Sequence, residues 1–265
     1  MALAIETAGL TRFFDDFRAV DEIDVAVERG TFYGFLGPNG AGKSTTIKML
    51  TGLLAPSRGA VTLLGMDALV PKQAIEIKRR IGVLPEDLAL FENLTAREHL
   101  TFIGRMHQLP RVTIRERIEE LLDVMRLDVD GKKLVLEYSH GMQKKLALAA
   151  ALLPNPELLF LDEPFEGIDA VTSRVIRDLL VQYVASGATV FLTSHVLEIV
   201  ERLCTHVGII VHGKLVEQSS LEQLRQGSSL EDRFLETVGE TNGTSEQLDW
   251  LDGRRAAGGG EEQVP

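Results

Sequence analysis

Two hydrophobic patterns alternate along the chain. One consists of short, nearly continuous apolar runs, which are typical of β-strands buried on both faces of a sheet. The other repeats apolar residues with the period of an amphipathic helix. The strand-type runs cover residues 4–10, 24–27, 31–37, 60–65, 81–85, 157–164, 188–195 and 206–217, and the helix-type runs cover residues 43–52, 95–107, 112–126, 140–153, 171–186 and 195–203. This alternation predicts an α/β fold with a mostly parallel core sheet.

The alternation is interrupted in two places and fades at the C-terminus. Residues 88–155 carry three helical patterns and no strand, so we interpret them as a helical subdomain inserted between two core strands. Residues 1–30 are expected to form a small antiparallel β layer. We therefore expect one large domain over residues 1–220 and a helical extension over residues 221–238. Residues 239–265 are rich in Gly, Glu and Gln and lack an apolar period, which predicts a disordered tail.

Composition and charge exclude several classes of protein. The 265 residues carry a net charge of −11, and because nucleic-acid binding relies on basic surface, this balance disfavours a nucleic-acid partner. Cys204 is the only cysteine and the chain starts without a secretory signal, so we expect a cytosolic protein without an internal disulfide. No apolar run approaches the roughly 20 residues that span a bilayer. If the protein works at a membrane, we expect another chain to do the spanning.

A glycine-rich segment, FLGPNGAGKST, follows one strand-type run and opens a helix-type run. Gly37, Gly42, Lys43 and Ser44 match the phosphate-binding pattern G-x-x-x-x-G-K-[ST]. The glycines let successive backbone N–H groups point at one anion, and the helix N-terminus adds positive potential there. The predicted phosphate-binding residues are Gly37, Pro38, Asn39, Gly40, Ala41, Gly42, Lys43, Ser44 and Thr45. The alternative, a glycine-rich turn with a chance lysine, does not account for the strand before it and the helix after it.

Two buried strands are expected to end in ionisable residues. Asp162 and Glu163 follow the apolar run that starts at Glu157, and His195 ends the run that starts at residue 188. The carboxyl ends of parallel strands form the edge where open α/β sheets bind ligands. Asp162 is suited to hold Mg²⁺ opposite Ser44, and Glu163 to accept a proton from the water that attacks a phosphate. The alternatives are a solvated strand end for the carboxylates and an ordinary helix cap for His195.

The stretch YSHGMQKK, residues 138–145, begins a long apolar helix. Ser139 suits the N-cap position, because its oxygen can accept from an unpaired helix N–H. Gly141 costs helix stability inside a helix, so a cap alone does not account for the stretch.

In this order the motifs resemble the ATP-binding cassette (ABC) family over about residues 3–220. Residues 37–45 resemble the Walker A loop, residues 158–163 the Walker B strand with its following glutamate, Asp169 the end of the D-loop, and His195 the switch histidine. The resemblance implies a P-loop NTPase core of the RecA type that binds ATP and Mg²⁺ and hydrolyses ATP. The domain over residues 1–220 is then the nucleotide-binding domain.

Residues 138–143 fall where this family has its signature sequence. The resemblance implies that the nucleotide held by a second subunit is contacted by Ser139, His140, Gly141, Met142, Gln143 and, through the D-loop, Asp169. Two cassettes would then enclose two ATP molecules head to tail. Phe14 stands where the family stacks an aromatic ring on adenine. Phe13 is a near rival, and a core position in the β layer is the alternative.

Two residues depart from the family pattern. His140 replaces a glycine of the signature, which leaves the geometry of the phosphate contact open. Glu86 replaces the glutamine of the loop that contacts Mg²⁺ and the attacking water. A glutamate can still bind Mg²⁺, so Ser44, Glu86 and Asp162 are the predicted metal ligands.

The Glu86 variant, the signature and the segment SLEDRFLE are similar to the exporter-type branch of the family. The resemblance implies an ATPase subunit that forms a homodimer and drives transport through a separate integral-membrane permease. It would lie on the cytoplasmic face of the membrane and bind no nucleic acid. The alternatives are a soluble cassette ATPase that acts on ribosomes or DNA, and a kinase or GTPase that uses only the phosphate loop. The last leaves residues 138–143 and His195 without a role.

Overall fold

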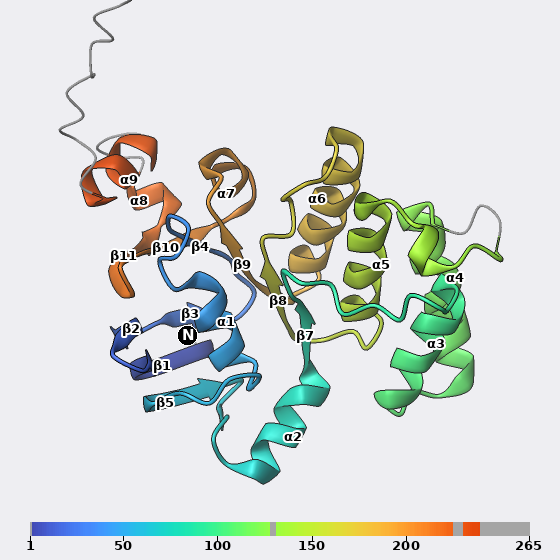
Figure 1. Cartoon of the computed structure of the whole chain (residues 1–265), viewed down its shortest axis with the longest axis horizontal. Coiled ribbons are helices and arrows are strands. Elements are labelled where there is room, and N and C mark those ends of the chain that lie inside the picture. The colour runs from blue at the N-terminus through green and yellow to red at the C-terminus, as the bar shows by residue number, and fades with distance from the viewer. Residues whose placement is uncertain (1, 128–130, 225–229, 239–265) are drawn as a thin grey trace, which may run out of the picture.

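The computed structural model describes residues 2–127, 131–224 and 230–238, so the predicted disordered tail lies outside the described residues. Two β-sheets with helices around them make up this part of the chain (Figure 1). The strands are β1 (Leu3–Phe14), β2 (Phe17–Ile23), β3 (Ala26–Glu28), β4 (Phe32–Leu36), β5 (Arg58–Leu63), β6 (Met66–Asp67), β7 (Ile81–Leu84), β8 (Leu158–Asp162), β9 (Thr189–Ser194), β10 (His206–Val211) and β11 (Lys214–Ser220). The helices are α1 (Lys43–Leu50), α2 (Pro71–Arg80), α3 (Ala96–Met106), α4 (Arg111–Met125), η1 (Val135–Glu137), α5 (His140–Leu152), α6 (Ala170–Ala185), α7 (Leu197–Leu203), α8 (Leu221–Leu224) and α9 (Leu230–Val238).

The central sheet has the strand order β11-β10-β4-β9-β8-β7 within the described residues. Strands β10, β4, β9, β8 and β7 run parallel, and β11 pairs antiparallel with β10 at one edge. The prediction of an α/β fold with a mostly parallel core sheet is confirmed. Because the parallel strands point the same way, their carboxyl ends meet at one edge of the sheet, where a ligand site is expected.

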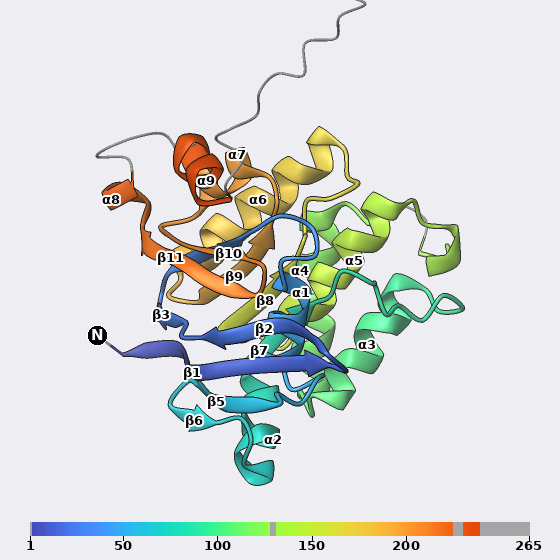
Figure 2. The same cartoon turned by 60° about the vertical axis from the view of Figure 1, so that its left-hand side comes forward.

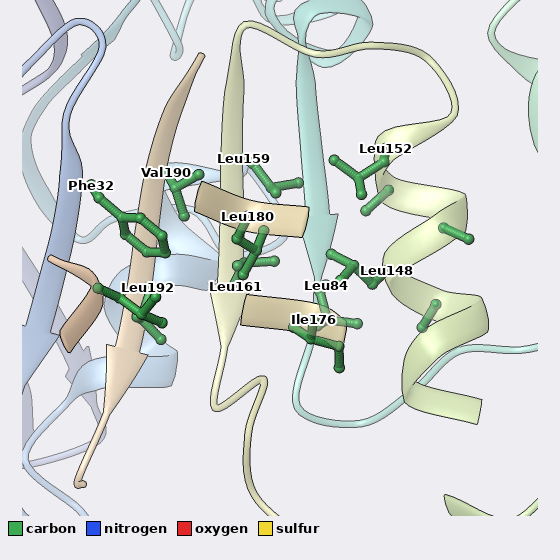
Figure 3. Close-up of a cluster of buried hydrophobic side chains, with 14 of the residues drawn as sticks. Phe32, Leu84, Leu148, Leu152, Leu159, Leu161, Ile176, Leu180, Val190 and Leu192 are labelled. Atoms are coloured by element: carbon green, nitrogen blue, oxygen red, sulfur yellow. The ribbon is translucent and has the colours of Figure 1, made fainter. Parts of the chain in front are cut away.

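Helices cover one face of this sheet, and the second sheet and α1 cover the other. In β4, Phe32 and Leu36 belong to one buried cluster, whereas Tyr33 and Phe35 belong to the other. Figure 3 shows the first cluster, in which Leu148 and Leu152 of α5 and Ile176 and Leu180 of α6 pack on the sheet. Burial on both faces is the reason that these strands read as continuous apolar runs.

Aromatic rings fill the second cluster. The ring of Phe191 lies 5.4 Å from those of Tyr33 and Phe35, and 5.7 Å from that of Phe160, between centroids. Ile47 of α1 completes this side of the core. These rings join β4, β8 and β9, and Ile47 adds α1, the helix that follows the phosphate loop, to the same cluster.

The antiparallel layer expected over residues 1–30 is present, and residues 58–67 extend it. β1 pairs with β2, β3 and β5, and β5 pairs with β6 (Figure 2). The register places Ile5 opposite Leu63. The apolar run at residues 60–65 identifies a strand, but the choice between two sheets depends on contacts far apart in the sequence.

Three longer helices, α3, α4 and α5, lie in the chain between the neighbouring strands β7 and β8. Figure 1 shows them on the side of the molecule away from β1 and β5. The boundaries at residues 88–155, 1–220 and 221–238 stay predictions. No helix within residues 2–127, 131–224 and 230–238 has the length and apolar character to cross a membrane.

Besides the three-residue helix η1, the helix α2 was not predicted. It starts with Pro71 at its first turn, and Ile77 is its one buried residue. Besides Pro71, its only apolar residues are Ala74, Ile75 and Ile77, which are too few to show a helical period in the sequence.

We expect Ile176→Ala to lower the free energy of unfolding by about 2–5 kcal/mol, because the removed side chain is fully buried under the central sheet. The matched control is Ile75→Ala, in α2, where the same side chain is 58% exposed and the expected change is within about 0.5 kcal/mol. Urea unfolding followed by circular dichroism measures both. Equal losses in the two variants would contradict the assignment of the core.

Candidate functional site

A pocket of about 380 Å³ opens at the carboxyl edge of the central sheet, beside the β1–β2 hairpin. The β1–β2 hairpin, the start of α1 with the loop before it, and the segments that follow β7, β8 and β9 form its walls. The lining residues are Phe14, Phe17, Ala19, Asn39, Gly40, Gly42, Lys43, Ser44, Thr45, Glu86, Glu163, Glu166 and His195. Most of the residues predicted to bind phosphate, metal and the attacking water therefore meet in one cavity.

The phosphate loop runs from the end of β4 to the start of α1. A side chain at Gly37 would come within 2.4 Å of the carbonyl oxygen of Ile210, so only glycine fits there. Gly42 has φ +108, a conformation that L-residues rarely adopt. The Nζ atom of Lys43 donates to the carbonyl oxygens of Gly37, at 2.8 Å, and Pro38, at 3.3 Å. The ammonium group of Lys43 is thus held against the carbonyl groups of the loop itself, and the side chain lines the pocket.

The three predicted metal ligands lie together, because both carboxylates approach the hydroxyl group of Ser44. Ser44 Oγ lies 3.2 Å from Asp162 Oδ1 and 3.3 Å from Glu86 Oε2, and its single proton serves one of them at a time. Thr193 Oγ1 donates to the same Asp162 oxygen at 2.6 Å. Carboxylate and hydroxyl oxygens are the ligands that Mg²⁺ prefers, so these residues fit that ion.

Asp162 is buried at the end of β8, and this burial raises the pKa of its carboxyl group above the ordinary value. Hydrogen bonds from Thr193 and Ser44 oppose the rise in pKa, while the nearby carboxylates of Glu86 and Glu163 add to it. A bound cation at this position would favour the charged form that burial penalises.

Glu163 follows Asp162 and reaches into the pocket. Its Oε1 atom lies 3.4 Å from Lys43 Nζ and 3.1 Å from His195 Nδ1. The same oxygen is buried and makes no hydrogen bond of acceptable angle among the described residues. A buried carboxylate oxygen with spare capacity is suited to accept a proton from a water molecule.

Aromatic side chains line the outer end of the pocket. Phe14 is 43% exposed, so it is not a core residue, and the side chain of Arg12 lies over its ring at 4.7 Å. Phe13 is not among the lining residues, and its ring is contacted by Arg18 and Arg58. The adenine-stacking role of Phe14 stays a prediction, which its position favours over Phe13.

Residues 139–143, at the start of α5, line no part of this pocket. Ser139 caps the helix by accepting from Met142 N at 3.4 Å, and Asp169 caps α6 by accepting from the N–H groups of Val171 and Thr172 at 2.9 Å. The hydrogen bonds from Thr172 hold the pKa of Asp169 below its ordinary value. These helix starts adjoin, because a Cβ atom at Gly141 would lie 3.4 Å from Thr172 Oγ1.

Several residues of the site were not predicted. Phe17 pairs with Phe14 across the β1–β2 hairpin. The sequence FFDDF, with two acidic residues between aromatic ones, was the available signal of this turn. Glu166 lines the pocket. Thr193 both supports Asp162 and accepts from Glu163 N at 3.0 Å, and Lys144 is buried beside the same segment. A threonine inside an apolar strand and a lysine in an apolar helix gave no sign of these contacts.

A parallel sheet, a glycine-rich loop before α1 and carboxylates at the carboxyl edge together define a P-loop nucleotide-binding protein. The family model "ABC transporter" matches residues 20–166. Over 227 residues the chain is 39% identical to the bacitracin transport ATP-binding protein BcrA of Bacillus licheniformis, which covers 85% of this chain and 72% of that protein. It is 38% identical to the daunorubicin resistance ATP-binding protein DrrA3 of Streptomyces coeruleorubidus, over 84% of this chain and 70% of that protein.

A solved structure of an ATP-binding subunit of an ABC transporter superposes with a TM-score of 0.82 at 29% identity, covering 88% of this chain and 99% of that one. The chain belongs to the ABC transporter family. It is an ATP-binding subunit of that family and an ATPase.

We expect Thr193→Val to lower ATPase turnover by about 10- to 100-fold, because the side chain supports both Asp162 and the main chain of Glu163. Thr189→Val is the matched control on the same strand. Thr189 Oγ1 accepts from Gly30 N at 2.9 Å, away from the pocket. Each variant should lose about 1–3 kcal/mol of stability, but only the first should lose turnover. Equal turnover of the two folded variants would contradict this role of Thr193.

Asp162→Asn should stabilise the Mg²⁺-free protein at neutral pH. Since burial raises the pKa of Asp162, the folded state binds its proton more tightly, and stability falls as pH rises from the ordinary aspartate pKa through the raised one. The amide escapes this penalty. Thermal unfolding at several pH values in chelator should show the gain at pH 7 and its disappearance near pH 3. Turnover with Mg²⁺ should fall by about 100-fold or more, since a metal contributes several kcal/mol to such reactions. A loss of stability at pH 7 would contradict the prediction.

Proposed function

We propose that this subunit closes with a second copy around two Mg²⁺-ATP molecules and thereby drives export through a separate membrane permease. The observation that carries the proposal is the separation of the two helix starts that are predicted to bind phosphate. The start of α1 lies in the pocket with Lys43 and Glu163, whereas the start of α5, with Ser139, lies outside it. A head-to-tail dimer brings the α5 start of one subunit to the phosphates held by the other.

The residues of the pocket have distinct roles in hydrolysis. Lys43 and the N–H groups at the start of α1 bind the phosphates. Ser44, Asp162 and Glu86 would hold Mg²⁺, whose positive charge would stabilise the transferred phosphoryl group. Glu163 Oε1 accepts the proton of the attacking water, and His195, 3.1 Å away, orients that carboxylate. Phe14 stacks on the adenine ring.

The α5 start completes the site from the opposite subunit. Ser139 and the N–H groups of His140 and Gly141 present hydrogen-bond donors and the positive end of the helix dipole to the terminal phosphate. These contacts form only in the closed dimer, so ATP binding shifts the equilibrium towards closure. Phosphate release removes them and reopens the dimer.

A groove beside the Glu86 loop supports a membrane partner. It measures about 470 Å³, lies between β7, α3 and α5, and has mainly apolar walls. Leu90, Ile103 and Ala147 are among its residues. A helix of the permease seated there would sense movement of Glu86 and of α5. Export as the direction, and the cytoplasmic face as the location, follow from the motifs that resemble the exporter-type branch. The names of the similar proteins, for bacitracin transport and daunorubicin resistance, agree with that direction.

Glu163→Gln should trap an ATP-bound dimer. The amide keeps the shape of the side chain but accepts no proton, so turnover should fall by about 100-fold or more. Size-exclusion chromatography with and without Mg²⁺-ATP should show a dimer only with nucleotide. Glu198→Gln, an exposed change on α7, is the control and should hydrolyse ATP normally. Unimpaired hydrolysis by Glu163→Gln would remove this residue from the central role.

A further inference from the structure

Lys144 is a buried lysine that the hydrolysis mechanism above does not use. It lies in the second turn of α5 and is only 3% exposed. Its Nζ atom donates to the carbonyl oxygens of Glu163, at 2.7 Å, and Glu166, at 2.6 Å. A buried ammonium group is costly unless acceptors satisfy it, so these two bonds define where the side chain sits.

The main chain of Glu163 needs such support. Its φ angle is +46°, in the left-handed region that costs a non-glycine residue roughly 1–2 kcal/mol. Such a conformation persists when its surroundings hold it from several sides. Thr193 accepts from the N–H group of Glu163, and Lys144 donates to its carbonyl oxygen. The peptide units on either side of the residue are therefore fixed by two different elements, β9 and α5.

The first turn of α5 touches the same segment a second time. The ring of His140 lies 3.2–3.3 Å from the position that a Cβ atom at Gly167 would take. His140 and Lys144 are four residues apart, which places both on one face of the helix. The start of α5 and residues 163–167 are thus joined at two points.

We propose that Lys144 is a positioning residue for ATP hydrolysis, which fixes the main chain of Glu163 and links it to the start of α5. The link rests on the proposed function, in which the start of α5 contacts the nucleotide held by the partner subunit. Contact with the partner's nucleotide restrains the start of α5. Through its hydrogen bond to the carbonyl oxygen of Glu163, Lys144 then restrains the main chain of Glu163 in its own subunit. Each pocket then becomes fully active only when the other pocket is filled.

Lys144→Met tests the proposal, because it keeps the length of the side chain and removes the donors. Turnover should fall by about 10- to 100-fold, since a displacement near 1 Å at a reacting group has effects of this size. The KM for ATP should stay within about twofold, because the phosphate loop is untouched. Lys144→Gln retains hydrogen-bond donors on a shorter side chain, so its turnover should lie between those of the wild-type protein and Lys144→Met. If Lys144→Met does not fold, the turnover of Lys144→Gln tests the proposal by the same criterion.

Lys145→Met is the matched control. Its Nζ atom also donates to a backbone carbonyl, that of Met125 at 2.7 Å, but this contact lies away from Glu163. A purely structural role would lower stability in both variants and turnover per folded molecule in neither. Turnover of Lys144→Met within twofold of this control, or a rise in KM that accounts for the whole loss, would overturn the proposal.

A dimerisation assay separates this inference from the proposed function. In the Glu163→Gln background, adding Lys144→Met should leave the ATP-dependent dimer intact, because the lysine acts on the catalytic step after closure. Loss of the dimer only on addition of Lys144→Met would overturn the positioning role. Absence of the dimer in Glu163→Gln itself would refute the proposed head-to-tail closure, whatever Lys144 does.

Discussion

The structure depends on buried charged side chains that lie together at the carboxyl edge of the central sheet. Asp162 and Glu163 are almost inaccessible to solvent, and so are Lys43 and Lys144. Removing single charges from water costs several kcal/mol each, so each must find a partner. Lys43 lies 3.4 Å from Glu163, while Lys144 is satisfied by backbone carbonyls. Burial lowers the pKa of Lys144, and the surrounding carboxylates, Glu166 and Glu163 foremost, oppose that shift.

This arrangement favours function over stability. The carboxylates outnumber the lysines in the pocket, and the pKa of Asp162 is raised by burial and, further, by the nearby carboxylates of Glu86 and Glu163. A divalent cation at Ser44, Asp162 and Glu86 would supply the missing positive charge. Binding of Mg²⁺-ATP is then coupled to the stability of the fold, since it relieves a penalty that the free protein carries. Active sites commonly concentrate such perturbed groups.

The sequence was sufficient to predict the fold class and most residues of the pocket, for physical reasons that can be named. Strands buried on both faces must be apolar throughout, and a loop that cradles phosphate needs glycine where side chains do not fit, as at Gly37. Pairing between distant segments leaves no local signal, so the union of β5 with β1 was not foreseen. The roles of Thr193 and Lys144 were not predicted for a related reason. Their roles come from two hydrogen bonds each to residues that the fold brings near, not from any local pattern.

His140 shows how the structure accommodates a departure from the family pattern. Where the signature has a glycine, the imidazole ring turns back against Gly167 of its own subunit. Gly167 has φ +67 and no side chain, so it leaves room for the ring. The substituted histidine therefore adds a contact between α5 and the segment that follows Glu163, the same segment that Lys144 holds. A substitution that leaves the phosphate contact open in the sequence is, in the fold, a second contact between the start of α5 and the segment that follows Glu163.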